Sequence, residues 1–287
     1  MPSDAIAAAA SASVSASAPA SVAYAGGPAP HAAVTGSSSG IGRAIAESLL
    51  ATGWRVTGLD VAPPAIAHPA FVHLLVDLAD GEVIARAAAA LLGSGPRDTT
   101  APNASGHASS HAPDPSPAPQ APYAPDALIH AAGVLRVGPL GQLDHAGGEL
   151  MWRLHVDAAT RLADALVPAM AARGRGRVVF IGSRVAQGMP GRGQYAATKA
   201  ALIALARSWA AEVAGQGVTL NVVSPAATAT GMLADPARAG SAPRLPPIGR
   251  LIEPAEIAAL TGYLLSPAAA AITGQDIAIC GGSSLAR

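Results

Sequence analysis

The stretch Thr35-Gly36-Ser37-Ser38-Ser39-Gly40-Ile41-Gly42 decides the fold of this chain. It follows a short apolar run at 31–35 and leads into a helical pattern at 41–52. Glycines at such a strand-to-helix turn permit a tight bend, let the backbone approach a pyrophosphate and allow close packing of helix on strand. The helix N-terminus then faces the phosphate charge. The turn residues expected to hold a dinucleotide are Gly36, Ser38, Gly40, Ile41 and Gly42.

Short apolar runs and helical patterns alternate along the rest of the chain. Strands are predicted at 31–35, 55–59, 71–76, 127–130, 177–181, 219–223 and 276–280. Helices are predicted at 41–52, 82–92, 148–173, 195–214 and 254–265. Strands that alternate with long helices predict a mostly parallel sheet covered on both faces. Right-handed crossovers then give an α/β, doubly wound, Rossmann-like fold in three layers.

Two low-complexity stretches interrupt this pattern. Residues 1–30 are rich in Ala, Ser and Pro, and residues 93–125 are rich in Pro with almost no branched aliphatic side chains. Such segments bury too little apolar surface to offset the entropy of ordering. We expect a flexible tail at 1–30 and a single domain at 31–287 with a flexible insertion at about 93–125. His107 and His111 in the insertion have metal-like spacing but no further ligands nearby, so no metal site is predicted.

The composition narrows the class of protein. The 287 residues carry no formal net charge, which gives no electrostatic reason to expect nucleic acid or an anionic membrane as partner. The single cysteine, Cys280, cannot form an internal disulfide, which fits a reducing compartment. No apolar stretch approaches the ~18–20 residues of a membrane span. Residues 1–30 contain no Lys or Arg, so neither a secretory signal nor a transit peptide is predicted. We expect a cytoplasmic protein.

Two carboxylates follow predicted strands. Asp60 ends the second strand, about 20 residues beyond the glycines, where an acidic side chain can accept hydrogen bonds from an adenosine ribose. The same charge would repel the 2′-phosphate of NADP, and no basic residue occupies Ser39 or the positions just after Asp60. The pattern therefore favours NAD, with NADP as the less favoured coenzyme. Asp77 follows the third strand and is either an adenine contact or a turn former.

The only lysine in the chain, Lys199, stands four residues after Tyr195. On a helix, residues i and i+4 lie on one face within side-chain reach. An ammonium beside a phenol stabilises the phenolate, which suits a tyrosine for acid–base chemistry. A surface lysine that happens to follow a tyrosine is the alternative, and the spacing alone does not decide between them.

Taken together and in order, these motifs resemble those of the short-chain dehydrogenases/reductases. The matching features are Thr35–Gly42, Asp60, Asp77, His130-Ala131-Ala132-Gly133, Ser183 and Tyr195-x-x-x-Lys199. The resemblance implies an NAD-dependent oxidoreductase that interconverts a secondary alcohol and its ketone by hydride transfer. Its partners would be a small alcohol or ketone and further copies of the chain, as a homodimer or homotetramer.

The resemblance also implies roles for individual residues. Tyr195 would be the general acid/base, Lys199 would assist it and hold the nicotinamide ribose, and Ser183 would hydrogen-bond the substrate oxygen. Gly133 would let the fourth strand pass close to the coenzyme. Thr228 and Thr230, in a segment like the family's Pro-Gly-x-x-x-Thr, would lie near the nicotinamide carboxamide.

Three residues depart from the family pattern. His130 and His155 stand where asparagine is usual, and Ala226 stands where glycine is usual. His155 either joins the proton relay of the family's asparagine, adding a pH dependence of its own if it titrates, or is an ordinary helix histidine. Ala226 matters only if the backbone there needs a positive φ. Because of His155 and Ala226, a catalytically silent NAD-binding protein is one alternative function.

Several segments are similar to bacterial 2,3-dihydro-2,3-dihydroxybenzoate dehydrogenases, among them 131–138, 221–225 and 272–277. Arg136 and Arg184 each follow the carboxyl end of a strand and are candidates for pairing with a substrate carboxylate. The substrate is therefore expected to be a cyclic or carboxylate-bearing alcohol. A 3-oxoacyl thioester reductase of the same family is the other alternative.

Overall fold

The computed structural model describes residues 28–93, 124–234 and 244–285. The predicted tail at 1–30 and insertion at 93–125 fall almost entirely outside these ranges. The last two residues of the predicted insertion are part of the fold. Ala124 is fully buried in the core, and the Arg173 guanidinium donates hydrogen bonds to the carbonyl oxygens of Ala124 and Pro125.

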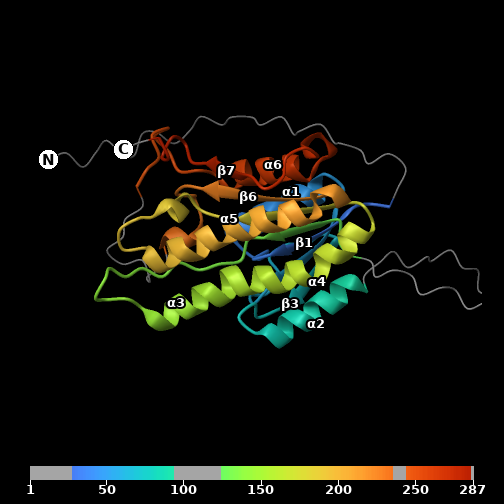
Figure 1. Cartoon of the computed structure of the whole chain (residues 1–287), viewed down its shortest axis with the longest axis horizontal. Coiled ribbons are helices and arrows are strands. Elements are labelled where there is room, and N and C mark those ends of the chain that lie inside the picture. The colour runs from blue at the N-terminus through green and yellow to red at the C-terminus, as the bar shows by residue number, and fades with distance from the viewer. Residues whose placement is uncertain (1–27, 94–123, 235–243, 286–287) are drawn as a thin grey trace, which may run out of the picture.

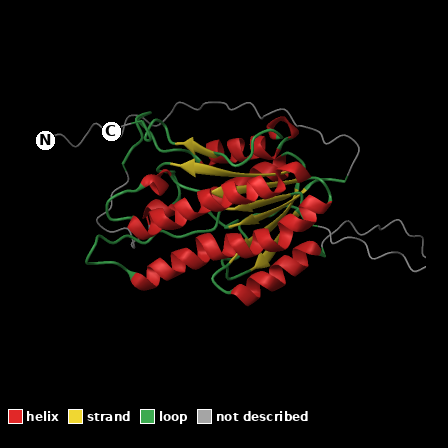
Figure 2. Ribbon diagram, in the orientation of Figure 1, coloured by secondary structure: helices red, strands yellow, loops and turns green. Residues whose placement is uncertain are grey.

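Seven parallel strands form one sheet in the described part of the chain, in the order β3-β2-β1-β4-β5-β6-β7. They are β1 (His31–Thr35), β2 (Arg55–Asp60), β3 (Phe71–Leu75), β4 (Ala127–His130), β5 (Gly176–Ile181), β6 (Val218–Pro225) and β7 (Asp276–Ile279). The arrowheads point to the same side in Figure 2, so the carboxyl ends share one edge. The doubly wound parallel sheet predicted from the sequence is confirmed.

Helices cover both faces of the sheet (Figure 1). They are α1 (Gly40–Ala51), α2 (Gly81–Leu92), α3 (His145–Trp152), α4 (Ala158–Ala172), α5 (Gly193–Val213) and α6 (Pro254–Leu265). The core cluster on one face joins the strands to α2, α4 and α5, and the cluster on the other face joins them to α1 and α6. This arrangement gives the three layers that were expected.

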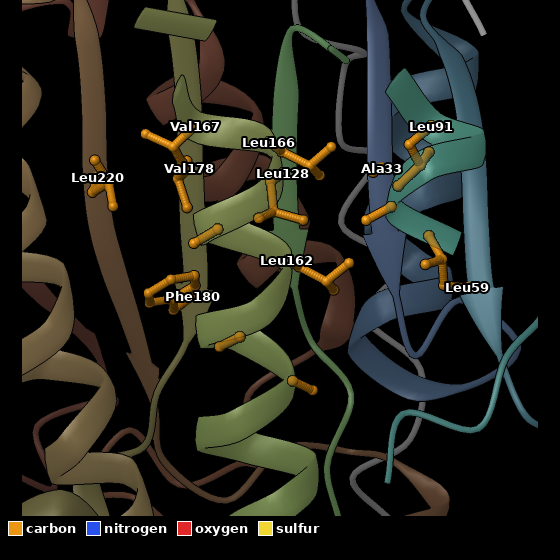
Figure 3. Close-up of a cluster of buried hydrophobic side chains, with 14 of the residues drawn as sticks. Ala33, Leu59, Leu91, Leu128, Leu162, Leu166, Val167, Val178, Phe180 and Leu220 are labelled. Carbon is orange, nitrogen blue, oxygen red and sulfur yellow. The ribbon is translucent and has the colours of Figure 1, made fainter. Parts of the chain in front are cut away.

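The core is built from alternating strand residues. Leu128 and Phe180 point toward α4, where Leu162 and Leu166 meet them (Figure 3). Their neighbour Ile129 points to the opposite face and packs with the α1 side chains. Successive side chains of a strand face opposite sides, and both sides are covered here, so the strands read as continuous apolar runs. Each fully buried Leu or Phe stabilises the fold by about 2 kcal/mol.

One predicted helix differs from the structure. The pattern at 148–173 forms two α-helices, α3 and α4, joined by a π-helical turn, η1 (Arg153–Asp157). A π turn adds one residue to a single helical turn, and the helices on both sides of it keep their own 3.6-residue apolar spacing, so the pattern did not reveal the junction. The turn contains His155 and faces the carboxyl ends of the central strands.

Candidate active site

The glycine turn between β1 and α1 packs tightly against the exit of β4. Gly36 has a φ of +70°, and a Cβ added there would lie 2.9 Å from the Ala132 backbone. A Cβ on Gly42 would lie 2.2 Å from the Gly36 carbonyl oxygen. Side chains at these positions would clash with the backbone and open the turn. Because both residues are glycines, the surface of the turn is formed by backbone atoms. β1 and β4 are neighbours although distant in sequence, and this is where an open α/β sheet binds its ligand.

Asp60 ties the end of β2 to this turn. One carboxylate oxygen accepts a 2.9 Å hydrogen bond from the Ser38 backbone N–H, and the other accepts one of 2.9 Å from the Ala62 N–H. Asp60 lines the same cavity as the glycines. The Asp60 carboxylate therefore fixes the loop by hydrogen bonds and also lines the cavity.

Two predicted coenzyme residues do not line the cavity. Ser38 contributes its backbone N–H to Asp60 and its hydroxyl to the Ala62 carbonyl, while Ser39 faces the cavity. The Asp77 carboxylate accepts a 2.8 Å hydrogen bond from the Ala79 N–H. This bond is the turn-forming role that the sequence left open for Asp77.

Lys199 is buried, with its side chain directed toward β5. Its Nζ donates a 2.9 Å hydrogen bond to the Ile181 carbonyl oxygen and lies 5.7 Å from the centroid of the Tyr195 ring. Burial lowers the pKa of Lys199 to about 7, because an ammonium loses hydration in the interior. The surface-lysine alternative is therefore wrong, and the i,i+4 spacing does bring the two side chains together.

Tyr195 and Ser183 lie on two elements that meet at this point. Ser183 follows β5, is nearly buried, and its hydroxyl oxygen accepts a hydrogen bond from the Val185 N–H at 3.2 Å. Tyr195 is in the first turn of α5 and packs with Leu135, Met151 and Val185. Both side chains line the cavity. Thr228 and Thr230 line it as well, which places them beside the other predicted site residues.

The cavity has a volume of about 870 Å³, a size that accommodates a large ligand. One end is formed by the glycine turn and Asp60, and the other by Ser183, Tyr195 and Lys199. Asp60 is the only carboxylate among the described residues that line it.

Three arginines line the cavity: Arg184, Arg192 and Arg244. Of these, only Arg184 was singled out from the sequence. Arg136, the other candidate, is not among the lining residues and donates a 3.0 Å hydrogen bond to the Leu135 carbonyl. Arg192 lies three residues before Tyr195, a proximity that could have indicated it. Arg244 was not singled out from the sequence either.

The three departures from the family pattern have structural explanations. Among the described residues no non-glycine has a positive φ, so Ala226 is unstrained. Burial, followed by the charge of Lys199, lowers the pKa of His130 to about 3 and holds that of His155 well below its usual range. Both imidazoles are neutral at physiological pH, and the expectation that His155 adds its own pH dependence does not apply. Gly133 lines the cavity, but its closest constraint is His155, whose Nε2 would lie 2.6 Å from an added Cβ.

No cluster of three or more metal-ligating side chains occurs in the part of the chain that the structure describes. Within that same part, no helix is both long and apolar enough to span a bilayer.

Comparisons with known proteins agree with this geometry. A family model described as enoyl-(acyl carrier protein) reductase matches residues 123–284, more than half of the chain. The chain is 32% identical to the 2,3-dihydro-2,3-dihydroxybenzoate dehydrogenase of Escherichia coli (strain K12), over 88% of this chain and 96% of that one. The chain belongs to the short-chain dehydrogenase/reductase family.

Two further comparisons place it within the family. A 3-oxoacyl-[acyl-carrier-protein] reductase of Escherichia coli (strain K12) is 34% identical over 88% of this chain and 96% of its own length. A solved structure titled as a short chain dehydrogenase/reductase family protein superimposes with a TM-score of 0.73 at 29% identity, covering 90% of this chain and 98% of that one. The chain is thus an oxidoreductase that acts on CH–OH groups of small molecules with a nicotinamide dinucleotide coenzyme.

Proposed function

We propose that this protein is an NAD-dependent dehydrogenase that interconverts a secondary alcohol and its ketone, with Tyr195 as general acid/base. The observation that carries the proposal is the pairing of Tyr195 with a buried Lys199 on the wall of a cavity whose far end is the glycine turn. A bound dinucleotide supplies or accepts the hydride, and the protein must move the matching proton.

The residues divide this work by position. Tyr195 gives a proton to the ketone oxygen or takes one from the alcohol, and Lys199 in its protonated form stabilises the phenolate that remains. The Ser183 hydroxyl donates a hydrogen bond to the substrate oxygen and so holds that oxygen beside Tyr195. Lys199 would also hold the nicotinamide ribose, and Thr228 and Thr230, which line the cavity, would bind the carboxamide. The lining residues proposed for the rest of the dinucleotide are Gly36, Gly40, Ile41, Gly42, Asp60 and Gly133. Ser38 and Asp77 are proposed to support the coenzyme site from the loops beside the cavity.

The choice of NAD over NADP rests on Asp60. Its carboxylate faces the cavity and is followed by Val61 and Ala62, neither of which can neutralise a 2′-phosphate. A ribose with free hydroxyls can donate to this carboxylate, whereas a phosphate there would meet like charge. This contrast supports NAD as the coenzyme.

The substrate is proposed to carry a carboxylate, either on a ring or on a chain. Arg184, Arg192 and Arg244 line the cavity, and the only described carboxylate that lines it, Asp60, is at the coenzyme end. Guanidinium groups bind carboxylates with two parallel hydrogen bonds. The dehydrogenase of Escherichia coli that is 32% identical acts on a dihydroxybenzoate derivative, as its name states.

The direct test is a coenzyme assay. Purified protein is mixed with NAD and a panel of secondary alcohols, each acidic member paired with its neutral analogue, and absorbance is followed at 340 nm. Acidic members should reduce NAD with the higher kcat/KM, and Arg184→Gln should lower that value about tenfold for acidic members only. Absence of turnover with every alcohol and with the corresponding ketones plus NADH would contradict the proposal.

A second candidate is reduction of 3-oxoacyl thioesters, favoured by the 34% identity to the acyl-carrier-protein reductase over nearly its full length. The same assay with a 3-oxoacyl thioester and NADPH distinguishes the two. Turnover with that pair above turnover with acidic alcohols and NAD would favour the second candidate.

We further propose one domain at 31–287 that assembles as a homodimer or homotetramer. The single sheet that contains both β1 and β7 supports one domain. The Ala-, Leu- and Ile-rich sequence of α5 supports pairing of this helix between subunits. Light scattering at micromolar concentration should give at least the mass of a dimer, and a monomer would contradict the assembly.

A further inference from the structure

The His155 side chain joins two parts of the site that are distant in sequence. It is fully buried in η1. Its Nε2 accepts a 3.1 Å hydrogen bond from the Val134 N–H, just beyond β4, and its Nδ1 lies 2.8 Å from the hydroxyl oxygen of Thr198 on α5. Thr198 is in the same helical turn as Tyr195. His155 therefore connects the exit of β4 to the start of α5.

The hydrogen-bond partners fix the tautomer of His155. The Thr198 hydroxyl donates its only proton to the Tyr195 carbonyl oxygen at 2.8 Å, so its oxygen must accept from His155 Nδ1. Val134 offers an N–H, so Nε2 must be the unprotonated nitrogen. The hydrogen bonds at both ring nitrogens therefore require a neutral imidazole with its proton on Nδ1. A protonated ring would lose the bond to Val134.

The His155 ring also touches the Tyr195 ring directly. The two rings are 5.6 Å apart at an interplanar angle of 88°, an edge-to-face contact that favours one orientation of the phenol. Gly133 makes this arrangement possible, because a Cβ there would lie 2.6 Å from His155 Nε2. The ring thus holds Tyr195 by its side chain and, through Thr198, by its backbone.

A second buried histidine fixes the turn that carries His155. The Thr35 hydroxyl oxygen accepts hydrogen bonds from the N–H groups of Ala131 and Ala132, so its proton goes to His130 Nδ1 at 3.0 Å. His130 Nε2 must then donate to the Leu154 carbonyl oxygen, also at 3.0 Å. The residue before His155 is thereby bonded to β4.

We infer that His155 is a positioning residue that sets the orientation of the Tyr195 phenol, through its ring contact and through Thr198. The inference rests on the proposed function in giving Tyr195 the acid/base role. The charged or titratable groups that face His155 are Lys199 and Tyr195 on α5 and His130 on β4. Burial, Lys199 and His130 keep the pKa of His155 well below its ordinary value, so Lys199 in its protonated form is the only cation of this group.

The first test needs no turnover. Two-dimensional NMR of ¹⁵N-histidine-labelled protein assigns the tautomer of each imidazole from its nitrogen shifts, with the His155→Asn spectrum identifying the His155 signals. The expected result is an uncharged His155 ring with the proton on Nδ1 from pH 5.5 to pH 9. A ring protonated within that range, or one with its proton on Nε2, would overturn the inference.

The second test compares three substitutions with a matched control. His155→Asn places an amide near the Nδ1 position and keeps the Thr198 bond, His155→Gln places one near Nε2 and keeps the Val134 bond, and His155→Leu removes both. The Thr198 hydroxyl is hydrogen-bonded to the Tyr195 carbonyl oxygen, so the variant that keeps the bond to Thr198, His155→Asn, should show the smallest fall in kcat. In His155→Leu it should fall about tenfold to a hundredfold. His145→Gln, on an exposed histidine of α3, should leave kcat unchanged.

Two readouts separate positioning from loss of fold. In His155→Leu the pH midpoint of kcat/KM should rise by about half a unit or more, since the phenol moves away from Lys199, while NADH affinity stays within about twofold. Thr198→Val should cause part of the His155→Leu loss, because the contact between the His155 and Tyr195 rings remains, and the double variant should be no worse than His155→Leu. An unchanged pH midpoint, additive losses, or His155→Gln retaining more kcat than His155→Asn would each overturn the inference. If wild-type protein shows no turnover, the proposed function fails instead, and the NMR result still stands.

Discussion

The two ends of the cavity are built from different parts of the chain. At the coenzyme end, the surface is formed mainly by backbone atoms. Gly36 and Gly42 have no side chain that would fill the turn, and the Asp60 carboxylate accepts hydrogen bonds from two backbone N–H groups. At the chemical end, buried side chains make it: Lys199 is almost fully enclosed. Substitutions at the coenzyme end should weaken coenzyme binding, and substitutions at the chemical end should slow the reaction while the coenzyme stays bound.

The largest effect is expected at the chemical end. Lys199→Met removes the cation beside Tyr195 while keeping a side chain of similar length, and kcat should fall about a thousandfold. Affinity for NADH, measured by fluorescence titration, should fall far less, because the glycine turn is untouched. A loss confined to NADH affinity, with kcat preserved at saturation, would contradict the division between the two ends.

The coenzyme end should respond in the opposite way. Gly42→Ala forces a Cβ to within 2.2 Å of the Gly36 carbonyl oxygen, so the turn must open and KM for NAD should rise about a hundredfold. Gly262→Ala in α6 is the matched control, since nothing lies within 4 Å of its added Cβ. That variant should keep wild-type kinetics and gain up to about 1 kcal/mol of stability.

A smaller effect is expected from Asp60→Asn. The amide keeps one oxygen to accept from the loop backbone but removes the charge that disfavours a 2′-phosphate. The ratio of kcat/KM for NAD to that for NADP should drop about tenfold. An unchanged ratio, measured on the same substrate with both coenzymes, would remove Asp60 from the account of coenzyme choice.

The smallest effect is on stability and comes from the low pKa of Lys199. Between about pH 7 and the ordinary lysine value of 10.5, the unfolded chain holds a proton on Lys199 that the folded chain does not. Stability therefore rises with pH across this window, and Lys199 destabilises the fold by a constant amount below it. The free energy of unfolding measured in urea, taken as the wild-type value minus the Lys199→Met value, should increase by about 1 kcal/mol per pH unit across this window. A flat difference would mean that Lys199 is charged in the folded protein.

The same contrast explains what the sequence could predict. The succession of strands and helices along the chain, the glycine turn, the place of Asp60 at a strand end and the Tyr195–Lys199 pair depend on local spacing, and the structure has them as expected. The π turn, the role of Gly133 and the burial of Lys199 depend on contacts between β4, β5, η1 and α5. These contacts join residues far apart in the chain, which no spacing rule relates. The single lysine was the one local sign that a buried cation was present.

The measurement that tests the central claim most directly is single-turnover hydride transfer in Tyr195→Phe, with NADH binding measured on the same preparation. Phenylalanine keeps the packing with Leu135 and Met151 and removes only the hydroxyl. The predicted result is NADH affinity within about twofold of the wild type and a rate of ketone reduction at least about a thousandfold lower. A rate close to that of the wild type would contradict the claim that this phenol transfers the proton.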